Sequence, residues 1–262
     1  MAFKKKFKII DSFIDFIDWE ECIEQILNWG HAKESRTVFL TSVHGIISAK
    51  YDLFIKKILN SADLSLPDGL PLTWLSYLCG NGNKTRISGH DLMSSLIEKS
   101  SQLSFTIFFY GSTNEVLDLI KKKISDEYQN IKVFTESPPF RQLTEKEDAE
   151  LIERVNLIKP NLFFVGLGHP KQEKWIFEHK NKINSVMIAV GAAFDFYSNK
   201  SRRAPIYLQK LGLEWLYRLI QNPRKLFKRY FIAISSFMFF AFIQIFLQNS
   251  KTLFNWFQKI FR

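Results

Sequence analysis

The stretch KPNLFFVGLGHPKQEKW, residues 159–175, decides the fold of this chain. Its apolar run at 162–165 combines aromatic and β-branched residues and predicts a buried strand. Gly166 and Gly168 follow directly, and Pro170 suits the first position of a helix. A strand, a glycine turn and a helix N-terminus place free backbone N–H groups at a sheet end, which suits a phosphate. An ordinary strand-to-helix turn is the alternative interpretation.

The polar residues of this turn favour a binding site over a simple connection. They are His169, Lys171, Gln172 and Glu173. The glycine spacing is neither GxGxxG nor a Walker A loop, so it predicts neither a standard dinucleotide site nor an ATPase site.

In the rest of the chain, short apolar runs alternate with segments in which apolar residues recur at helical spacing. Strands are predicted at 37–41, 63–66, 105–110, 131–134 and 186–190, and helices at 16–30, 46–62, 70–78, 91–101 and 115–128. A further helix is predicted from Thr144, with Glu147 at capping-box distance. Segments 136–143 and 191–205 are predicted loops. Apolar strands between helices predict an α/β fold, a Rossmann-like, mainly parallel sheet with helices on both faces.

The composition of the chain fits a globular protein with ample core. It has 262 residues, 46% of them hydrophobic, and 26 Phe. The two cysteines, Cys22 and Cys79, have no metal-ligand spacing and imply no disulfide framework. The basic N-terminus acquires Asp11, Asp15 and Asp18 before any apolar region forms, so we expect no signal peptide.

The net charge of +10 is concentrated at the C-terminal end. Residues 1–200 carry 25 Lys and Arg against 25 Asp and Glu, whereas 201–262 carry 11 basic residues and one acidic residue, Glu214. Such asymmetry implies an anionic partner, either a nucleic acid or a membrane surface. We therefore predict a catalytic domain at 1–212 and a basic, apolar helical appendage at 213–262.

The appendage contains 21 uncharged residues at 230–250, followed by a basic amphipathic segment at 251–262. A bilayer core needs roughly 20 apolar residues, so the uncharged run is long enough to span. Ser235, Ser236, Gln244 and Gln248 weaken that interpretation, and the segment that follows is typical of an interfacial helix. Membrane contact is expected, by spanning or by lying in the interface. The aromatic residues stand in apolar runs, so no nucleic-acid surface is expected.

Polar residues at predicted strand ends are the candidates for ligand binding, because open α/β sheets bind ligands beyond the carboxyl ends of their strands. They are Thr41 with His44, Asp68, Gly111 with Ser112 and Thr113, and the turn from Gly168 to Gln172. Asp68 stands in a PDG turn, so a purely structural turn aspartate is the alternative. Arg86 is either a phosphate ligand or a surface charge.

Seven blocks of the chain carry a family resemblance. They are ADLSLPDG (62–69), TRISGHDLM (85–93), SPPFRQLTEKED (137–148), VGLGHPKQEKW (165–175), GAAFDF (191–196), RRAP (202–205) and GLEWLYRLIQNPRKLFKRY (212–230). In this order and spacing the chain resembles the WecG/TagA/CpsF family, bacterial glycosyltransferases of glycosyltransferase family 26. The stretches ESPPFRQL (136–143) and GAAFDF (191–196) resemble its exopolysaccharide branch.

The resemblance implies an inverting glycosyltransferase of cell-surface polysaccharide biosynthesis, such as teichoic acid or capsule. The expected donor is a UDP-sugar carrying N-acetylmannosamine, N-acetylmannosaminuronic acid or a related hexose. The acceptor is a polyprenyl-diphosphate-linked saccharide, and the place is the cytoplasmic face of the cell membrane. No metal cofactor is expected, and homo-oligomer formation stays open. An inactive membrane-bound scaffold protein is the alternative, whereas an epimerase or dehydrogenase would need motifs that are not visible.

The resemblance also implies roles for individual residues. Asp68 matches the proposed general base, with His44 as a rival, and Thr41 matches a strand-end threonine. Arg86 matches an arginine that holds phosphate or sugar, and Gln172 a partner for sugar hydroxyls. These four, Asp68, Thr41, Arg86 and Gln172, are the catalytic candidates. Val43 replaces an asparagine often found there, so this corner departs from the family.

The substrate-binding candidates combine the strand-end turns with the family blocks. They are His44, Gly111, Ser112, Gly166, Gly168, Pro170, Lys171, Glu173, Asp195, Arg203, Arg218, Arg224 and Arg229. Arginines offer a metal-free way to stabilise a leaving diphosphate. Which of the C-terminal cations faces the diphosphate stays open.

Overall fold

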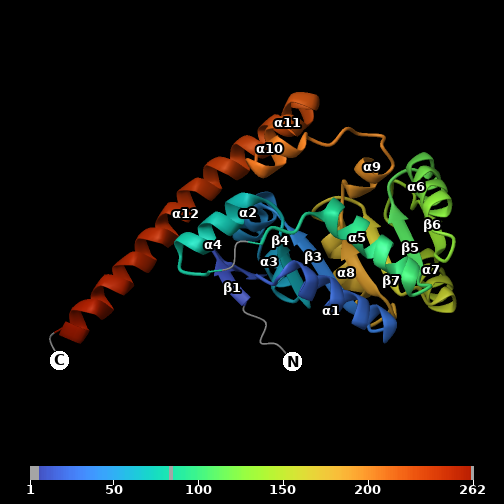
Figure 1. The fold of residues 1–262 in the computed structure, drawn as a ribbon, viewed down its shortest axis with the longest axis horizontal. Helices are drawn as coiled ribbons and strands as arrows, with labels where there is room; N and C mark the ends of the chain where they lie inside the picture. The colour runs from blue at the N-terminus through green and yellow to red at the C-terminus, as the bar shows by residue number, and fades with distance from the viewer. Residues whose placement is uncertain (1–5, 83–84, 261–262) are drawn as a thin grey trace.

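The computed structural model describes residues 6–82 and 85–260, and their side chains apart from 225 and 249–260. A six-stranded parallel sheet, in the order β4-β3-β8-β7-β5-β6, forms the centre of the molecule (Figure 1). Its strands are β3 (Arg36–Thr41), β4 (Leu64–Pro67), β5 (Thr106–Gly111), β6 (Lys132–Glu136), β7 (Leu162–Gly166) and β8 (Val186–Ala189). The predicted α/β class and parallel sheet are confirmed.

Helices cover both faces of this sheet, because alternate strand side chains are apolar on either side. In β5, Ile107 and Phe109 face one core cluster, and Phe108 and Tyr110 face the other. The first cluster is covered by α1 (Trp19–His31), α5 (Gly89–Gln102), α6 (Asn114–Glu127) and α9 (Ala193–Tyr197). The second is covered by α2 (Val43–Tyr51), α3 (Leu53–Asn60), α7 (Glu145–Ile158) and α8 (Lys171–His179).

Stacked phenylalanines fix the register between β5 and β7. Phe108 pairs with Phe163 and Phe109 with Phe164, at ring-centroid distances of 4.8 and 5.3 Å. Such cross-strand pairs stabilise one alignment, because a shift by one residue would exchange the two faces. Both strands therefore end together, at Gly111 and Gly166.

These two glycines are required by packing. A Cβ on Gly111 would lie 2.7 Å from the backbone of Gly166, and a Cβ on Gly166 would lie 2.6 Å from the ring of Phe194. Gly111 also has φ 115°, a conformation that side chains rarely adopt. The strand ends thus meet at a spacing that only glycine allows.

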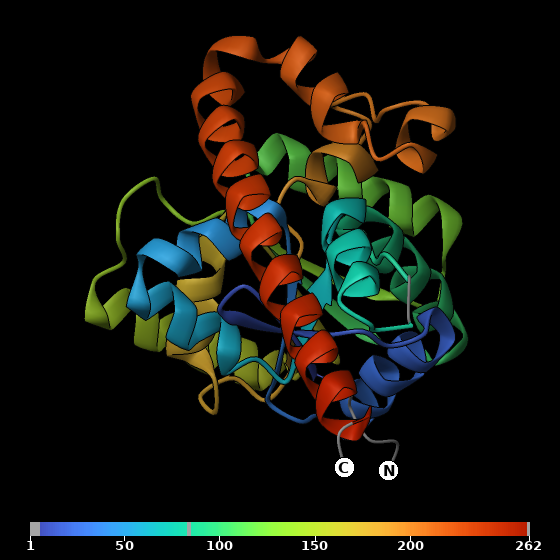
Figure 2. The same cartoon turned by 90° about the vertical axis from the view of Figure 1, so that its left-hand side faces the viewer.

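A third core lies beside the sheet, between an N-terminal hairpin and the C-terminal helix. The hairpin is β1 (Lys6–Ile9) with β2 (Ser12–Asp15). The remaining helices are α4 (Leu70–Leu78), α10 (Ile206–Lys210), α11 (Glu214–Gln221) and α12 (Pro223–Ile260), of which α4 and α12 contribute residues to this core. One face of α12 packs against α2 and α4 through Phe237 and Ala241, and Figure 2 shows the helix crossing the molecule there.

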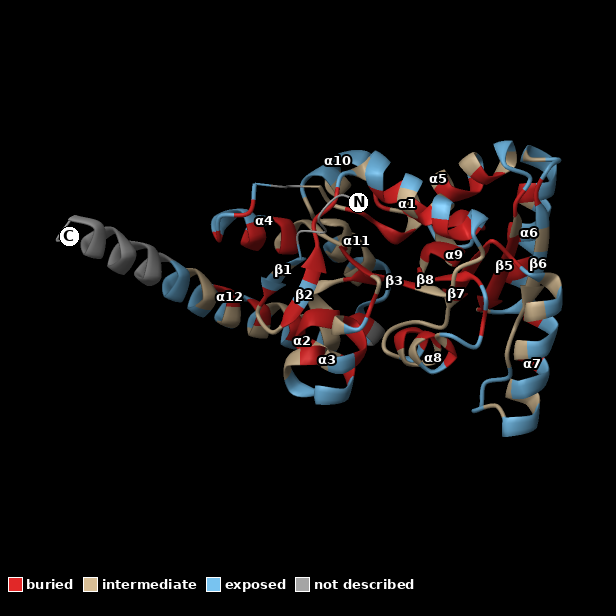
Figure 3. Cartoon of the chain, turned by 90° about the horizontal axis from the view of Figure 1, so that it is seen from below, coloured by how far each residue is buried: buried red, intermediate tan, exposed pale blue. Residues whose placement is uncertain are grey.

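Along its described length, α12 has one face that contains buried residues and one that is exposed. Its inner face contains buried residues, and its outer face is exposed along the part that Figure 3 colours. The exposed residues are Phe227, Phe231, Ile232, Met238, Phe239, Phe242, Ile243, Phe246 and Leu247. By length and composition, residues Leu226–Gln248 could cross a membrane, although a core helix can pass the same test.

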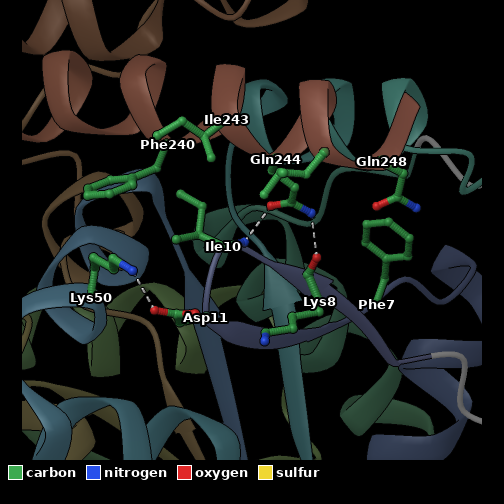
Figure 4. A pocket seen from close by; sticks show the side chains of 10 residues that line it. Phe7, Lys8, Ile10, Asp11, Lys50, Phe240, Ile243, Gln244 and Gln248 are labelled. Carbon is green, nitrogen blue, oxygen red and sulfur yellow. Dashed lines mark hydrogen bonds and ion pairs between the residues drawn. The ribbon is translucent and has the colours of Figure 1, made fainter. Parts of the chain in front are cut away.

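Gln244 of α12 holds the hairpin turn in place (Figure 4). Its Oε1 accepts a 2.7 Å hydrogen bond from the Ile10 amide, and its Nε2 donates to the Lys8 carbonyl at 2.8 Å. Ile10 has φ 56°, which is strained for a β-branched residue. Gln248 donates to the carbonyl of Cys79. These two amides of the uncharged run therefore bind protein backbone.

Several boundaries differ from the sequence predictions. The helix predicted at 46–62 is two helices, because the side chain of Asp52 caps α3. The loop predicted at 191–205 contains α9, and the β1–β2 hairpin was not predicted. Pro170 is the N-cap of α8 instead of its first residue. The capping box of Thr144 and Glu147 is confirmed.

Two further predictions concern the appendage. The backbone of α12 is helical to Ile260, whereas the side chains of the predicted amphipathic face at 251–262 lie outside the described residues. The domain boundary at 212 stays a prediction.

We expect Gly111→Ala to lower the free energy of unfolding by about 2 kcal/mol or more, through strain and steric overlap. Gly82→Ala is the matched control, since no atom of the described residues lies within 4 Å of its added Cβ. Thermal unfolding of both variants checks the difference. Equal midpoints for the two variants would contradict the packing role.

Candidate functional site

A cavity of about 390 Å³ lies at the carboxyl ends of β3, β4 and β8, with α11 and α12 on its far side. This is the edge at which parallel sheets bind ligands. Nine of the residues singled out from the sequence line it: Thr41, His44, Asp68, Arg86, Gly168, Gln172, Glu173, Arg218 and Arg229. The fold thus gathers segments that are up to 188 positions apart in the chain.

Asp68 follows directly after β4 at the cavity floor. Its amide donates a 2.9 Å hydrogen bond to the Thr41 carbonyl, which ties it to the neighbouring strand. Burial and the negative charge of Glu214 raise the pKa of Asp68 to about 6, although Arg86 and Arg218 act in the opposite direction. A carboxyl group with this pKa can accept a proton near neutral pH.

An ionic cluster surrounds Asp68. Glu214 of α11 lies 3.5 Å from Arg86 Nη2 and 3.5 Å from Arg203 Nε. Arg86 also donates to the Gln209 carbonyl at 3.3 Å. Arg203 donates from Nη2 to Asp91 Oδ2 at 2.9 Å. Carboxylates thereby hold both arginines, Arg86 in the cavity lining and Arg203 outside it.

The opposite wall contains two histidines and a buried glutamate. The rings of His44 and His169 meet edge to face, with centroids 4.9 Å apart. His169 Nδ1 lies 3.2 Å from Glu173 Oε2. Burial, with the neighbouring His169 and Arg229, lowers the pKa of His44 to about 4. His44 is therefore neutral at physiological pH and a weaker proton acceptor than Asp68.

Thr41 and Gln172 make contacts within the protein. The Thr41 hydroxyl shares a 2.8 Å hydrogen bond with that of Ser65. Gln172 Oε1 accepts from the Gly168 amide at 3.1 Å, and its Nε2 donates to Glu173 Oε1 at 3.1 Å. Both side chains thus support the cavity walls.

The other candidates lie away from the cavity lining. They are Gly111, Ser112, Gly166, Pro170, Lys171, Asp195, Arg203 and Arg224. Gly111 and Gly166 serve packing, the Ser112 carbonyl accepts from Ser137, and Arg203 braces the ionic cluster. The Asp195 carbonyl accepts from the Ser201 amide. Lys171 and Arg224 are exposed.

Sequence reasoning did not select two ionisable side chains of this site, Glu214 and His169, as individual candidates. Glu214 was noted only as the single acidic residue of a basic tail, and that isolation was the signal available for it. His169 was noted in the polar turn but not selected, because its pairing with Glu173 depends on the helical turn between them. Among the described residues, no group of three or more His, Cys, Asp and Glu is placed to hold a metal ion. The metal-free reaction stays a prediction.

Known proteins share this sequence pattern. The chain is 37% identical over 168 residues to an N-acetylglucosaminyldiphosphoundecaprenol N-acetyl-beta-D-mannosaminyltransferase of Bacillus subtilis (strain 168). The aligned stretch covers 63% of this chain and 64% of the relative. The protein of the same name from Bacillus spizizenii is 29% identical over 81% of this chain and 82% of its own length. The protein of that name from Staphylococcus aureus (strain MW2) is 31% identical over 65% of this chain and 66% of its own length.

The model of the Glycosyl transferase WecG/TagA/CpsF family matches residues 7–251. That match includes the hairpin from Phe7 onward, the whole parallel sheet and the described part of α12 that lines the cavity. The chain belongs to the WecG/TagA/CpsF family of glycosyltransferases.

Proposed function

We propose that this protein transfers a sugar from a nucleotide-diphospho-sugar, with UDP as the expected nucleotide, to a polyprenyl-diphosphate-linked saccharide. The acceptor of the relatives, by their names, is N-acetylglucosaminyldiphosphoundecaprenol. N-acetylmannosamine is one candidate sugar, beside N-acetylmannosaminuronic acid or a related hexose. The product belongs to a cell-surface polysaccharide, with the exopolysaccharide type as one branch.

The observation that carries this proposal is the position of Asp68. It is a carboxyl group with a raised pKa, at a strand end, in a cavity that also contains the guanidinium groups of Arg86, Arg218 and Arg229. A general base beside fixed positive charge suits transfer of a sugar away from a diphosphate.

In the proposed reaction, the Asp68 carboxylate takes the proton of the acceptor hydroxyl while its oxygen attacks C1 of the donor sugar. The new C1–O bond forms as the bond from C1 to the phosphate oxygen breaks. The electron pair of that bond leaves with the nucleoside diphosphate, and attack from the opposite side inverts the anomeric centre. Among the described residues, Arg218 and Arg229 make no ion pair with protein carboxylates, so their charge is available to the leaving group.

Transfer assays with a panel of UDP-sugars and a polyprenyl-diphosphate-sugar acceptor test this function. We expect transfer from one donor, and a loss of about 10²–10⁴-fold in kcat in Asp68→Asn, because the amide cannot accept the proton. Unchanged activity in Asp68→Asn would assign the base elsewhere. No transfer from any donor would favour the alternative, an inactive membrane-bound scaffold.

The pH profile provides a separate prediction. Asp68 must be ionised to act as base, so kcat/KM should rise with pH to a plateau through an apparent pKa of about 6. Glu214→Gln removes a negative neighbour that raises this pKa, so the midpoint should move to lower pH. Glu20→Gln, an exposed carboxylate on α1, is the control and should leave the midpoint in place. A midpoint in Glu214→Gln that stays or moves upward contradicts this coupling.

We further propose that the protein works at the cytoplasmic face of the cell membrane, with α12 lying in the interface. The inner face of α12 is committed to the hairpin and α2, and Gln244 binds backbone there. A spanning helix would have to break these contacts. The outer face is exposed and can enter the headgroup boundary, and the basic residues of 201–262 suit anionic lipid.

We expect the triple change Phe231→Ser, Phe239→Ser and Phe242→Ser to weaken binding to anionic vesicles by about tenfold or more. The reason is that the three substitutions remove apolar surface that would otherwise be buried in lipid. Phe140→Ser is the matched control, because Phe140 is 99% exposed in a loop far from α12 in the sequence. Vesicle sedimentation measures both. Equal losses in the two proteins would exclude this face as the contact.

A further inference from the structure

A second cavity, the hairpin groove, lies between the β1–β2 turn, α2 and α12, outside the candidate active site (Figure 4). Its volume is about 500 Å³, within the range of about 300–1,000 Å³ that is usual for small-molecule sites. The proposed transfer reaction uses none of the residues that line it. The chemistry of its two walls therefore indicates what else the protein binds.

The wall that α12 supplies is apolar. Phe240, Ile243 and Leu247 are three and four positions apart, so they share one side of the helix, and all three line the groove. Ile243 and Leu247 also belong to the exposed outer face of α12. The groove is thus continuous with the face that we propose enters the lipid interface.

The wall that the hairpin turn and α2 supply is charged. Lys50 Nζ donates a 2.8 Å hydrogen bond to Asp11 Oδ2 and lies 4.8 Å from the centroid of the Phe240 ring. Lys56 Nζ lies 3.9 Å from the same carboxylate oxygen. The hydrogen bond from Lys50 holds the pKa of Asp11 below its usual value, and the neighbouring lysine charges act in the same direction. One carboxylate is thereby surrounded by three lysines, Lys8, Lys50 and Lys56.

The ammonium groups are the donors that this wall offers to a ligand. The amides of Gln244 and Gln248 are already bound to backbone groups of the protein. An ammonium has three N–H donors, and Asp11 accepts one of those of Lys50. Lys8 makes no ion pair with a carboxylate of the described residues. Cationic donors opposite an apolar wall suit a ligand that is anionic at one end and apolar at the other.

The order of the two walls matches the order of layers in a bilayer. With the outer face of α12 in the interface, the apolar wall lies toward the acyl chains, and the lysines lie on the protein side, toward the headgroups. Tyr51, the residue after Lys50, is 68% exposed, and its ring meets that of Phe240 edge to face at 6.3 Å. Tyrosine is enriched at the boundary between membrane and water.

We propose that the hairpin groove binds one anionic phospholipid, with its phosphate on Lys8 and Lys50 and an acyl chain along Phe240, Ile243 and Leu247. The proposal rests on the membrane location proposed above and goes beyond it, because it assigns a single lipid to a defined site. General attraction of a basic surface acts on every anionic headgroup nearby. The groove adds a shape that holds one chain between the hairpin and α12.

Native mass spectrometry of the full chain in detergent, titrated with phosphatidylglycerol or with phosphatidylcholine, tests this inference. The charge variants are Lys8→Gln and Lys50→Gln, and Lys121→Gln, exposed on α6, is the control for a lost positive charge. Ile243→Trp fills the groove without a change of charge. Its control is Ile232→Trp, which is exposed on the same helix and does not line the groove.

We expect the wild type and both controls to retain one phosphatidylglycerol, and to bind phosphatidylcholine about tenfold more weakly or less. Lys8→Gln and Lys50→Gln should each bind phosphatidylglycerol about fivefold more weakly, since each removes one cation from the phosphate. Ile243→Trp should lose the retained lipid yet still sediment with vesicles that contain phosphatidylglycerol, because tryptophan itself favours the interface. General surface attraction would not produce this separation.

Equal retention of the two lipids would overturn the site, as would wild-type retention in a folded Ile243→Trp. Chains that carry no phosphatidylglycerol would overturn it too, and association of such chains in pairs would assign the groove to a second copy. Thermal unfolding in detergent establishes which variants fold, and the two charge variants serve where Ile243→Trp does not.

Failure of this proposal can be told apart from failure of the proposed function, because lipid retention in detergent needs neither a bilayer nor a sugar donor. Absent retention beside intact transfer and vesicle binding removes the lipid site alone. The expected retention pattern without transfer or without vesicle binding removes the proposed reaction or the proposed location alone.

Discussion

The docking of α12 on α2 and the hairpin is the contact on which the cavity depends. Phe237 is buried in this contact and also lines the cavity, so one side chain both holds the helix and closes the site. α12 in turn packs on α11, which carries Glu214 and Arg218. Those two charges act on Asp68. A helix that the sequence presents as a membrane element is therefore part of the electrostatics of the site.

The sheet could be predicted because its strands are buried on both faces. Continuous apolar runs such as 162–165 need no partner to be recognised, and parallel pairing follows from the helices between them. The β1–β2 hairpin could not be predicted in this way. Its turn places Ile10 in a left-handed conformation, and the stabilising amide of Gln244 lies 234 residues further along the chain. Local sequence carries no information about such a partner.

For the candidate site, the sequence predicted which residues lie at the strand ends, but not the role of each residue. Thr41, Asp68 and Gln172 could be chosen because strand order brings carboxyl ends to one edge. The glycines at 111 and 166 follow strands too, but backbone contact and the Phe194 ring explain them. Position along a strand tells where a residue lies, whereas its role depends on what occupies the space next to it.

Glu214 shows what the site requires of its charges. Arginines near Asp68 suit a diphosphate, yet each of them also lowers the pKa of the carboxyl group that must accept a proton. Glu214 pairs with Arg86 and Arg203 and raises the pKa of Asp68 directly. One acidic residue in a basic tail thus allows the cavity to contain arginines for a diphosphate while the pKa of Asp68 stays raised. Arg229 has no such carboxylate partner among the described residues. It lines the same cavity on the side of the histidines, where its charge acts on His44.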